Sequence, residues 1–317
     1  MYGHDLKSVL RSRIDMRECR GRLQAGSQSF FAASLLLPKV YRQPITALYA
    51  FCRLADDEID AATAQQSALE RLYERLDRIY SDRPGNCSVE RAFSDVVLRH
   101  RIPYALPAAM LEGFAWDLDG RCYESVSDVY AYSARVAGTV GVMMAILMGA
   151  REKEVLSRAC DLGVAMQLTN IARDVGEDAR SGRVYLPSEL LAEHGIRSDE
   201  WLQEPVFNEA AAHATRQILE RADGLYRRAE WGIRQLPLVC RPAMFAARLI
   251  YADIGREIEQ AGFDSVSRRA VVPQSRKGAL LIRAARAATT SGRRDRAPVL
   301  NEVRFLIDAA VEAGAAG

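Results

Sequence analysis

Apolar residues recur at intervals of three and four along almost the whole of this 317-residue chain. No segment shows the alternating, valine- and isoleucine-rich pattern of a β-strand, so the periodicity predicts an all-α protein. Hydrophobic residues make up 49% of the chain, which is enough for a large core. No repeat, low-complexity tract or linker divides the sequence, and we therefore expect one domain spanning residues 1–317.

Prolines, glycines and polar turns set the limits of the expected helices. Ser27 is a good N-cap for the second of them, and Pro44 suits the start of the third. The apolar run 136–150 is expected to be a buried core helix, too short to span a bilayer. The expected helices cover residues of about 5–24, 27–37, 44–60, 66–81, 89–101, 103–119, 136–150, 152–180, 205–236, 242–260, 277–290 and a last stretch after 298.

Composition excludes several classes of function. A formal net charge of +2 gives no reason to expect nucleic acid as a partner. The 6 cysteines lack CxxC pairs and the 4 histidines are dispersed, which argues against a zinc site. Scattered thiols and an amino terminus without the apolar core of a signal peptide indicate a cytoplasmic protein.

Two acidic stretches, at residues 56–60 and 170–178, lie inside apolar helical segments. Residues four apart share one face of a helix, roughly 6 Å apart along its axis. The first row consists of Asp56 and Asp60, and the second of Asn170, Asp174 and Asp178. Like charges at this spacing destabilise an isolated helix. The rows therefore need a counter-charge, which divalent cations bound together with a phosphate substrate would supply.

A solvated acidic face is the ordinary interpretation of either stretch taken alone. The apolar flanks, however, indicate that both helices are mostly buried. Each stretch also has arginine nearby, Arg53 beside the first row and Arg173 and Arg183 beside the second. Guanidinium groups at these places suit a diphosphate site.

Two glycines, Gly138 and Gly141, interrupt a helical pattern, at a cost of roughly 1 kcal/mol each relative to alanine. They indicate either tight packing of two helices or a kink where a ligand approaches the backbone. The sequence leaves both alternatives open.

The residues around the two rows resemble the paired signatures of the squalene and phytoene synthases. These signatures are Tyr49–Asp60 and Gln167–Asp178, the second closed by Gly182–Pro187. Ser27–Phe30, Val136–Gly141 and Tyr251 match as well. The resemblance covers residues of about 20–280. It implies an isoprenoid synthase-type helical bundle with a central cavity, in which a prenyltransferase joins two prenyl diphosphates head to head.

The resemblance also implies roles for individual residues. The ligands of Mg²⁺, with Mn²⁺ as an alternative ion, would be Asp56, Asp60, Asn170, Asp174 and Asp178. The catalytic set would comprise the four aspartates with Arg53 and Tyr132, the tyrosine facing the ionising carbon. The residues expected to bind substrate are Ser27, Gln28, Ser29, Phe30, Tyr49, Arg53, Val136, Gln167, Arg173, Arg183, Tyr185, Tyr251, Arg269 and Lys277.

Within the family, the first signature is most similar to that of bacterial phytoene synthases. The implied reaction condenses two geranylgeranyl diphosphates to phytoene, through a cyclopropylcarbinyl diphosphate, in carotenoid biosynthesis. Eukaryotic squalene synthases also use NADPH and carry a membrane anchor. This chain has no Gly-rich dinucleotide signature and its tail is amphipathic, so we expect no NADPH. A deep tunnel for C20 chains would have small floor residues, and the candidates are Ala33, Ala137, Ala145 and Ala165.

Three alternatives remain open at this point. They are a C30 (dehydro)squalene-type synthase using farnesyl diphosphate, a terpene cyclase or chain-elongating prenyltransferase of the same fold, and a non-catalytic assembly factor. Because the expected product is insoluble in water, peripheral contact with the inner face of the membrane is also considered. The basic segment 268–286, with interleaved apolar residues, could bind anionic lipid there. Its other interpretation is a solvated helix face combined with a substrate clamp.

Overall fold

The computed structural model describes residues 2–61, 65–292 and 294–315, except for the side chains of residues 2–10, 28, 29 and 65. Within these ranges the chain is helical and has no strand, which confirms the all-α prediction. The long helices of the first half are α1 (Tyr2–Gly26), α3 (Lys39–Asp60), α4 (Gln65–Tyr80), α5 (Ser88–His100), α6 (Ala105–Leu118) and α8 (Thr139–Leu147). Those of the second half are α9 (Lys153–Arg180), α12 (Glu209–Gln235), α13 (Arg241–Gln260), α14 (Gln274–Thr289) and α15 (Arg304–Ala315). The shorter helices are α2 (Gln28–Ser34), α7 (Val126–Ser133), α10 (Ser188–Ala192) and α11 (Ser198–Gln203).

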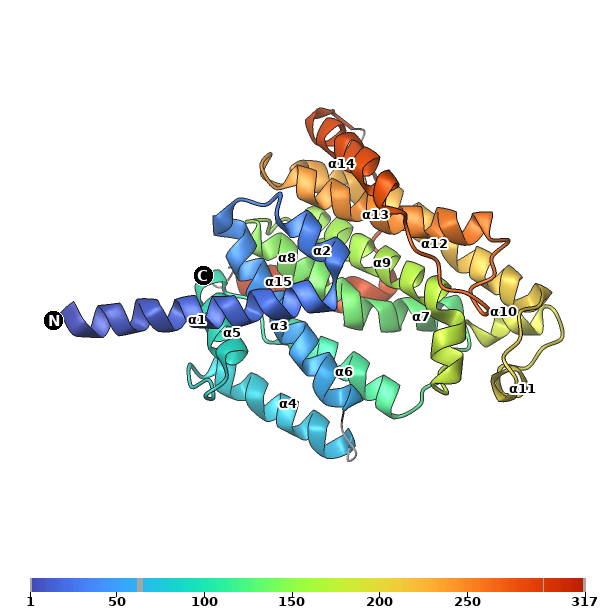
Figure 1. Ribbon diagram of the computed structural model, residues 1–317, viewed down its shortest axis with the longest axis horizontal. Coiled ribbons are helices and arrows are strands. Elements are labelled where there is room, and N and C mark those ends of the chain that lie inside the picture. The colour runs from blue at the N-terminus through green and yellow to red at the C-terminus, as the bar shows by residue number, and fades with distance from the viewer. Residues whose placement is uncertain (1, 62–64, 293, 316–317) are drawn as a thin grey trace.

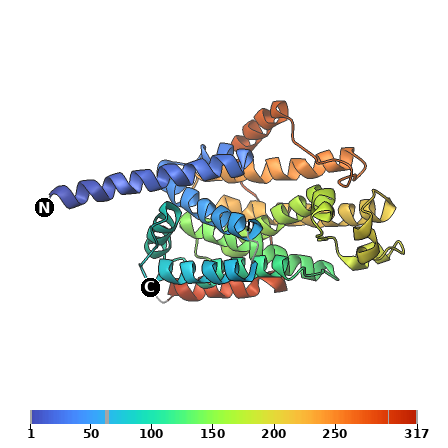
Figure 2. The ribbon, with the colours of Figure 1, turned by 60° about the horizontal axis from the view of Figure 1, so that its bottom comes forward.

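Helix α9 lies at the centre of the bundle and packs against α8, α12 and α13 (Figure 1). Its apolar residues are buried over most of its length, as the sequence pattern predicts. Helices α1 and α14 lie on one side of the molecule and α15 on the opposite side (Figure 2). The acidic rows of α3 and α9 therefore project from helices whose other faces are fixed in the core.

A π-helical turn, Ala134–Gly138, joins α7 to α8 in one continuous helix, Val126–Leu147. With 22 residues, this helix is long and apolar enough to cross a membrane by length and composition. The expectation that the run was too short is thus wrong. However, 61% of its most apolar window is buried inside the protein, so the structure agrees with the expected core helix.

The glycines of this helix bring two backbones into contact. A Cβ atom on Gly141 would lie 2.3 Å from the carbonyl oxygen of Ala159, and one on Gly163 would lie 2.3 Å from that of Ala137. No side chain fits at such distances, so α8 and the π-turn pack directly on the backbone of α9. Tight packing is confirmed, and the helix is also distorted by the π-turn.

The expected helices differ from the observed ones at several places. Helix α3 begins at Lys39, after Pro38, so Pro44 lies inside the helix rather than at its start. The extended ψ of Pro38, 148°, sets the beginning of the helix, and Pro44 removes one backbone hydrogen bond near it. The stretch 188–204, for which no helix was expected, contains the short helices α10 and α11.

A buried ion cluster fixes the segment before α15. The Asp161 carboxylate is fully buried, 3.0 Å from the Arg158 guanidinium and 3.1 Å from that of Arg228. Arg158 also donates to the carbonyl of Ala297 (2.8 Å) and Arg228 to that of Pro298 (2.7 Å). Because removing one partner of such a cluster leaves buried charge uncompensated, this contact holds the C-terminal segment on α9 and α12.

Candidate active site

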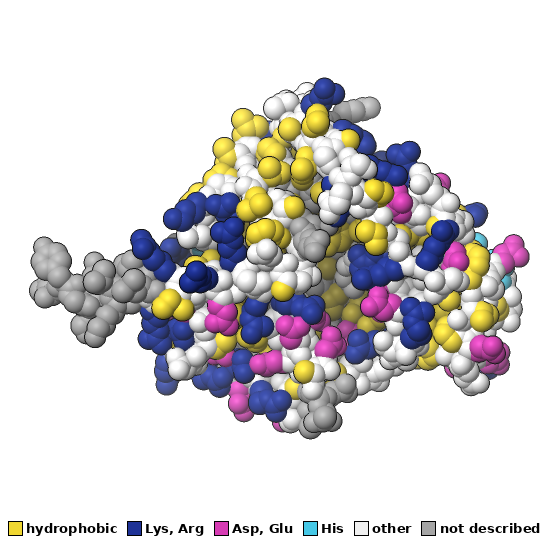
Figure 3. Space-filling model, viewed as in Figure 1, with side chains coloured by type: hydrophobic (Ala, Val, Ile, Leu, Met, Phe, Trp, Pro, Cys, Tyr) yellow, Lys and Arg dark blue, Asp and Glu magenta, His cyan; other side chains and the backbone are white. Residues whose placement is uncertain are grey.

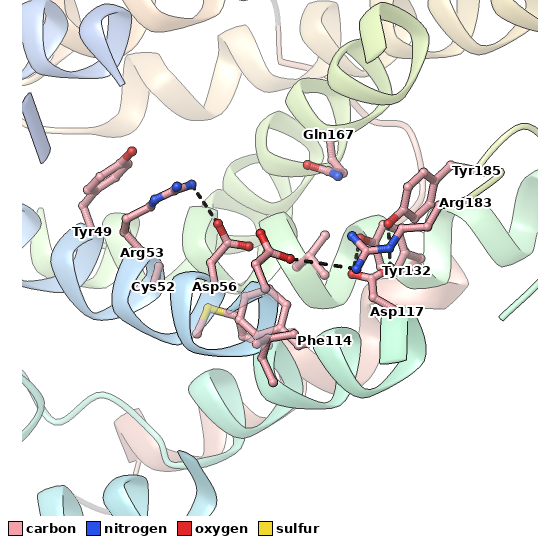
Figure 4. A pocket seen from close by; sticks show the side chains of 14 residues that line it. Tyr49, Cys52, Arg53, Asp56, Phe114, Asp117, Tyr132, Gln167, Arg183 and Tyr185 are labelled. Atoms are coloured by element: carbon pink, nitrogen blue, oxygen red, sulfur yellow. Dashed lines mark hydrogen bonds and ion pairs between the residues drawn. The ribbon is translucent and has the colours of Figure 1, made fainter. Parts of the chain in front are cut away.

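A cavity of about 380 Å³ opens between α3, α6, α9, the π-turn and the loop after α9. Figure 4 shows polar side chains from these elements pointing into it from several sides. Its apolar part comes from Ile59, Met110, Phe114 and Val136. The predicted residues that line it are Tyr49, Arg53, Asp56, Asp60, Tyr132, Val136, Gln167, Arg183 and Tyr185.

The first acidic row is only partly neutralised. An Arg53 Nη atom lies 2.8 Å from an Asp56 carboxylate oxygen, and the other Nη atom lies 2.8 Å from Asp57. Burial and the neighbouring charge of Asp60 nevertheless raise the pKa of Asp56 to about 6. Asp60 is 3.9 Å from Arg183. The negative charge of this row is thus not fully balanced by the arginines of the protein.

The second row differs from one carboxylate to the next. Burial raises the pKa of Asp174, but hydrogen bonds from Arg173 (2.8 Å) and Arg269 (2.7 Å) outweigh it, and the pKa lies below the ordinary value. Burial and the charge of Asp174 raise the pKa of Asp178 to about 7. The Oδ1 atom of Asn170 is buried and has no hydrogen-bond partner among the residues that the structure describes. An oxygen donor therefore remains free on this row.

The end of α9 returns the chain toward the cavity. Gly182 has a φ of +78°, a conformation that ends helices and that glycine adopts without strain. The N–H of Arg183 donates to the carbonyl of Asp178 (2.9 Å), completing the helix cap. This turn places the side chains of Arg183 and Tyr185 in the cavity wall. The glycine of the loop signature therefore turns the chain so that Arg183 and Tyr185 reach the cavity.

Asp117, at the end of α6, is a central residue of the cavity that the sequence analysis missed. Its two carboxylate oxygens accept hydrogen bonds from the hydroxyls of Tyr132 (2.8 Å) and Tyr185 (2.7 Å). Burial raises the pKa of Asp117, while the two tyrosine hydrogen bonds oppose the shift. An acid at the end of an apolar helix was the available signal, but on its own it resembles an ordinary exposed helix end.

The two tyrosines form part of an aromatic wall. The ring centroids of Tyr132 and Tyr185 are 5.1 Å apart with nearly parallel planes, and Tyr123 packs on both rings. Burial, together with the charge of Asp117, raises the pKa of Tyr132 well above its ordinary value. The hydroxyls are neutral at physiological pH, with their hydrogens directed to Asp117.

The start of α2 closes one side of the site. Ser27 caps the helix by accepting from the N–H of Phe30 (3.2 Å), as predicted, and its side chain also hydrogen-bonds Tyr251. The ring of Phe30 stacks on that of Tyr49 at 5.3 Å. The side chains of Gln28 and Ser29 lie outside the described residues.

Other predicted residues, among them Asn170, Arg173, Asp174, Asp178 and Tyr251, do not line the cavity. Arg269 approaches Asp174 from the segment 263–272, which crosses α9. Lys277 lies in the first turn of α14 and does not line the cavity. The alanines expected at the floor, Ala33, Ala137, Ala145 and Ala165, do not line it either. These alanines lie in contacts between helices. The apolar surface of the cavity is formed instead by residues of α3, α6 and the π-turn, together with Tyr132 at the end of α7.

The donor set fits Mg²⁺ held jointly by protein and substrate. Among the described residues, no group of three or more His, Cys, Asp or Glu side chains is close enough to hold an ion alone. Mg²⁺ usually binds through one or two carboxylates together with substrate phosphates rather than in an all-protein cage. Asp56 and Asp178, whose pKa values are raised, and the free oxygen of Asn170 provide that kind of partial site.

Comparison with known proteins agrees with this geometry. The family model described as "Squalene/phytoene synthase" matches residues 23–276. The phytoene synthase of Rhodobacter capsulatus is 48% identical over 304 residues, covering 93% of this chain and 90% of the relative. That of Cereibacter sphaeroides is 48% identical over 314 residues, covering 94% and 88%. The crystal structure of a dehydrosqualene synthase with bound ligand superimposes with a TM-score of 0.78 at 32% identity, covering 86% of this chain and 96% of that one. The chain belongs to the squalene/phytoene synthase family.

Proposed function

We propose that this protein is a phytoene synthase, a prenyltransferase that condenses two molecules of geranylgeranyl diphosphate head to head in carotenoid biosynthesis. The observation that carries the proposal is that the first carboxylate row, Asp56 and Asp60, lines a cavity with an apolar surface, together with Arg53 and Arg183. Asp178 of the second row lies close enough to Arg183 and Asp117 of the cavity wall for their charges to shift its pKa. Such an arrangement binds two diphosphates at one end of a space that accepts hydrocarbon. The 48% identity with phytoene synthases supports the choice of a C20 substrate.

The reaction requires departure of a diphosphate from an allylic carbon. When bound, Mg²⁺ ions would neutralise the leaving diphosphate, and Asp56, Asp60, Asn170, Asp174 and Asp178 would hold them. Arg53, Arg173 and Arg183 would bind phosphate oxygens, for which the forked guanidinium is suited. A low-dielectric site strengthens these interactions during charge separation.

The aromatic wall would protect the carbocation that remains. Tyr132 and Tyr185 face the cavity, and Asp117 holds their hydroxyl hydrogens, so their oxygens present lone pairs to it. Addition of the cation to the C2–C3 double bond of the second substrate, followed by loss of one proton as the three-membered ring closes, gives a cyclopropylcarbinyl diphosphate. Loss of its diphosphate, rearrangement and loss of one proton then give phytoene. Apolar side chains such as Phe114 and Val136 exclude water, which would capture the cation.

Product analysis tests the proposal. Purified protein is incubated with geranylgeranyl or farnesyl diphosphate and Mg²⁺, without NADPH, and the hydrocarbon is identified by mass spectrometry. We expect phytoene and two diphosphates released per molecule of product. Formation of only a C30 hydrocarbon from farnesyl diphosphate would contradict the C20 assignment, and one diphosphate per product would indicate a cyclase. Asp174→Asn, which should lower turnover at least about 100-fold without loss of helix, is the inactive control.

We further propose that the protein works in the cytoplasm, in contact with the inner face of the membrane. Free thiols at all six cysteines support a reducing compartment. The basic segment 268–286 is a weak candidate for lipid contact, because Arg269 pairs with Asp174 and Arg276 with Asp253 and Glu257. Recovery of the protein with inner membranes after low-salt fractionation, and its release by high salt, would support the location.

A further inference from the structure

A second, smaller cavity lies on the outer side of α2, between α1 and α3. This groove has a volume of about 270 Å³ and shares no lining residue with the active-site cavity. Four basic residues line it, Arg17 and Arg20 of α1 and Lys39 and Arg42 of α3. Its apolar lining includes Leu23, Phe31 and Leu35. The groove thus combines a basic rim with an apolar floor.

The positive charge of the groove is not balanced by the protein. No aspartate or glutamate lines it, and within the described part of the chain none of its four basic side chains forms an ion pair. Neighbouring arginines differ in this respect: Arg22 pairs with Asp57 at 3.6 Å, and Arg91 with Asp15. Four basic side chains without acidic partners around one groove favour binding of an anion, and guanidinium groups are suited to phosphate.

The hydroxyl groups of the groove are already engaged. Ser34 donates to the carbonyl of Phe31 and Thr46 to that of Arg42, each at 2.7 Å. The Arg20 guanidinium lies over the ring of Phe31, 5.7 Å from its centroid. The basic side chains are therefore the principal hydrogen-bond donors available to a ligand, and one of them already borders the apolar floor.

Exposed apolar side chains stand beside these cations. Leu35, Leu36 and Val40 are 47%, 43% and 70% exposed. Figure 3 shows a band of Lys and Arg side chains where α1 passes the α2–α3 turn, and hydrophobic side chains next to this band, over α13 and α14. A soluble phosphate would not engage the leucines. An anionic bilayer engages both kinds of side chain, since apolar groups enter the acyl boundary and cations meet the lipid phosphates.

We propose that this groove docks the protein on an anionic phospholipid surface. A lipid phosphate binds among Arg17, Arg20, Lys39 and Arg42, and Leu35 and Leu36 enter the acyl region. Helix α2 links this surface to the active site, because Phe30 stacks on Tyr49 of the cavity wall while the next residue, Phe31, lines the groove. Docking thus places the α2 side of the active site next to the bilayer, in which an apolar substrate and product dissolve. Only this last consequence depends on the proposed function.

Flotation of the full-length protein with lipid vesicles tests the docking. We expect binding to vesicles of phosphatidylcholine mixed with phosphatidylglycerol, and none to phosphatidylcholine alone. Lys39→Gln/Arg42→Gln should weaken binding roughly 25-fold, since each basic residue at an anionic surface contributes about five-fold. Arg283→Gln/Arg286→Gln removes the same charge from α14 and should weaken binding less than about three-fold. Leu35→Ser/Leu36→Ser should also weaken it.

Three results would overturn the proposal. If Lys39→Gln/Arg42→Gln binds the vesicles with native affinity, the groove is not the docking site. If both double variants lose the same vesicle affinity, general attraction between the charges explains the binding. Conversion of a dimer to a monomer by the leucine variant, seen by sedimentation, makes this face an interface between copies. The groove variants should keep native melting temperature and native turnover of detergent-dispersed substrate. Because vesicle binding is measured without substrate, its failure is distinguishable from failure of the proposed reaction.

Discussion

The backbone N–H of Gly176 donates to the carbonyl oxygen of Ser265 at 2.9 Å. Gly176 lies between Asp174 and Asp178 on α9, and Ser265 belongs to the segment 263–272, here called the strap. A Cβ at position 176 would lie 2.1 Å from the carbonyl oxygen of Val266. The strap therefore touches bare backbone in the middle of the second acidic row. This contact brings Arg269 to the Asp174 carboxylate.

Gly176→Ala should detach the strap without unfolding α9, because alanine favours a helix by about 1 kcal/mol relative to glycine. We expect faster hydrogen exchange in residues 263–272, and a KM for substrate raised at least about ten-fold. Arg269→Gln is the matched control, since it removes the guanidinium but leaves the backbone contact. It should raise KM with unchanged exchange in the strap. Native exchange in Gly176→Ala would show that the contact does not hold the strap.

Asp117→Asn should lower kcat by about 10- to 100-fold, because an amide presents one acceptor oxygen where two tyrosine hydroxyls now donate. One hydroxyl would be left buried without a partner, at a cost of about 1–3 kcal/mol in the free energy of unfolding. Steady-state kinetics and urea unfolding measure the two effects. Asp119→Asn, on the exposed side of the same helix end, should change neither. Equal effects of the two substitutions would remove the special role of Asp117.

The response to Mg²⁺ should depend on pH through Asp178. Its pKa of about 7 exceeds the ordinary 3.8, so the folded protein binds this proton more tightly than the unfolded chain does. Stability is therefore lost as pH rises between about 4 and about 7. A bound cation removes that penalty, so Mg²⁺ should raise the melting temperature more at about pH 8 than at about pH 6. Asp178→Asn should flatten the difference. Equal Mg²⁺ shifts at both pH values in the native protein would contradict the prediction.

Val136→Phe should shift substrate preference from C20 toward C15. The side chain of Val136 lines the cavity, and a larger ring there shortens the space for the hydrocarbon. Five carbons correspond to roughly 4 kcal/mol of burial per chain, so the C20-to-C15 ratio of kcat/KM should fall at least about ten-fold. Val140→Phe, one turn further along the helix and outside the cavity wall, is the control. A ratio that falls equally in both variants would indicate a general packing defect.

The sequence predicted the parts of this site that repeat along a helix. Asp56 with Asp60, and Asp174 with Asp178, are four residues apart, so α3 and α9 present each pair without knowledge of the tertiary structure. Asp117 could not be found in this way, because its partners come from α7 and from the loop after α9. Its environment exists only after three separate elements have packed.

The floor of the cavity shows the same limit. Small residues were expected there because a long substrate needs depth, but Ala145 and Ala165 serve helix packing and are buried against neighbouring helices. Large residues such as Met110 and Phe114 line the space instead. Tertiary packing decides which face of an apolar helix lines a cavity and which face contacts another helix. Because α6 is apolar on most sides, its sequence has no periodic pattern that distinguishes the two faces.

The π-turn at Ala134–Gly138 has a consequence for how this chain can vary in evolution. The N–H of Thr139 donates to the carbonyl of Ala134, five residues back, so the turn holds one residue more than an α-helical turn. Loss of a single residue here would restore a regular helix and rotate Tyr132 by about 100° relative to α8, away from Asp117. The length of the turn cannot change without separating the two residues. Relatives that perform the same reaction are therefore expected to keep the same number of residues here.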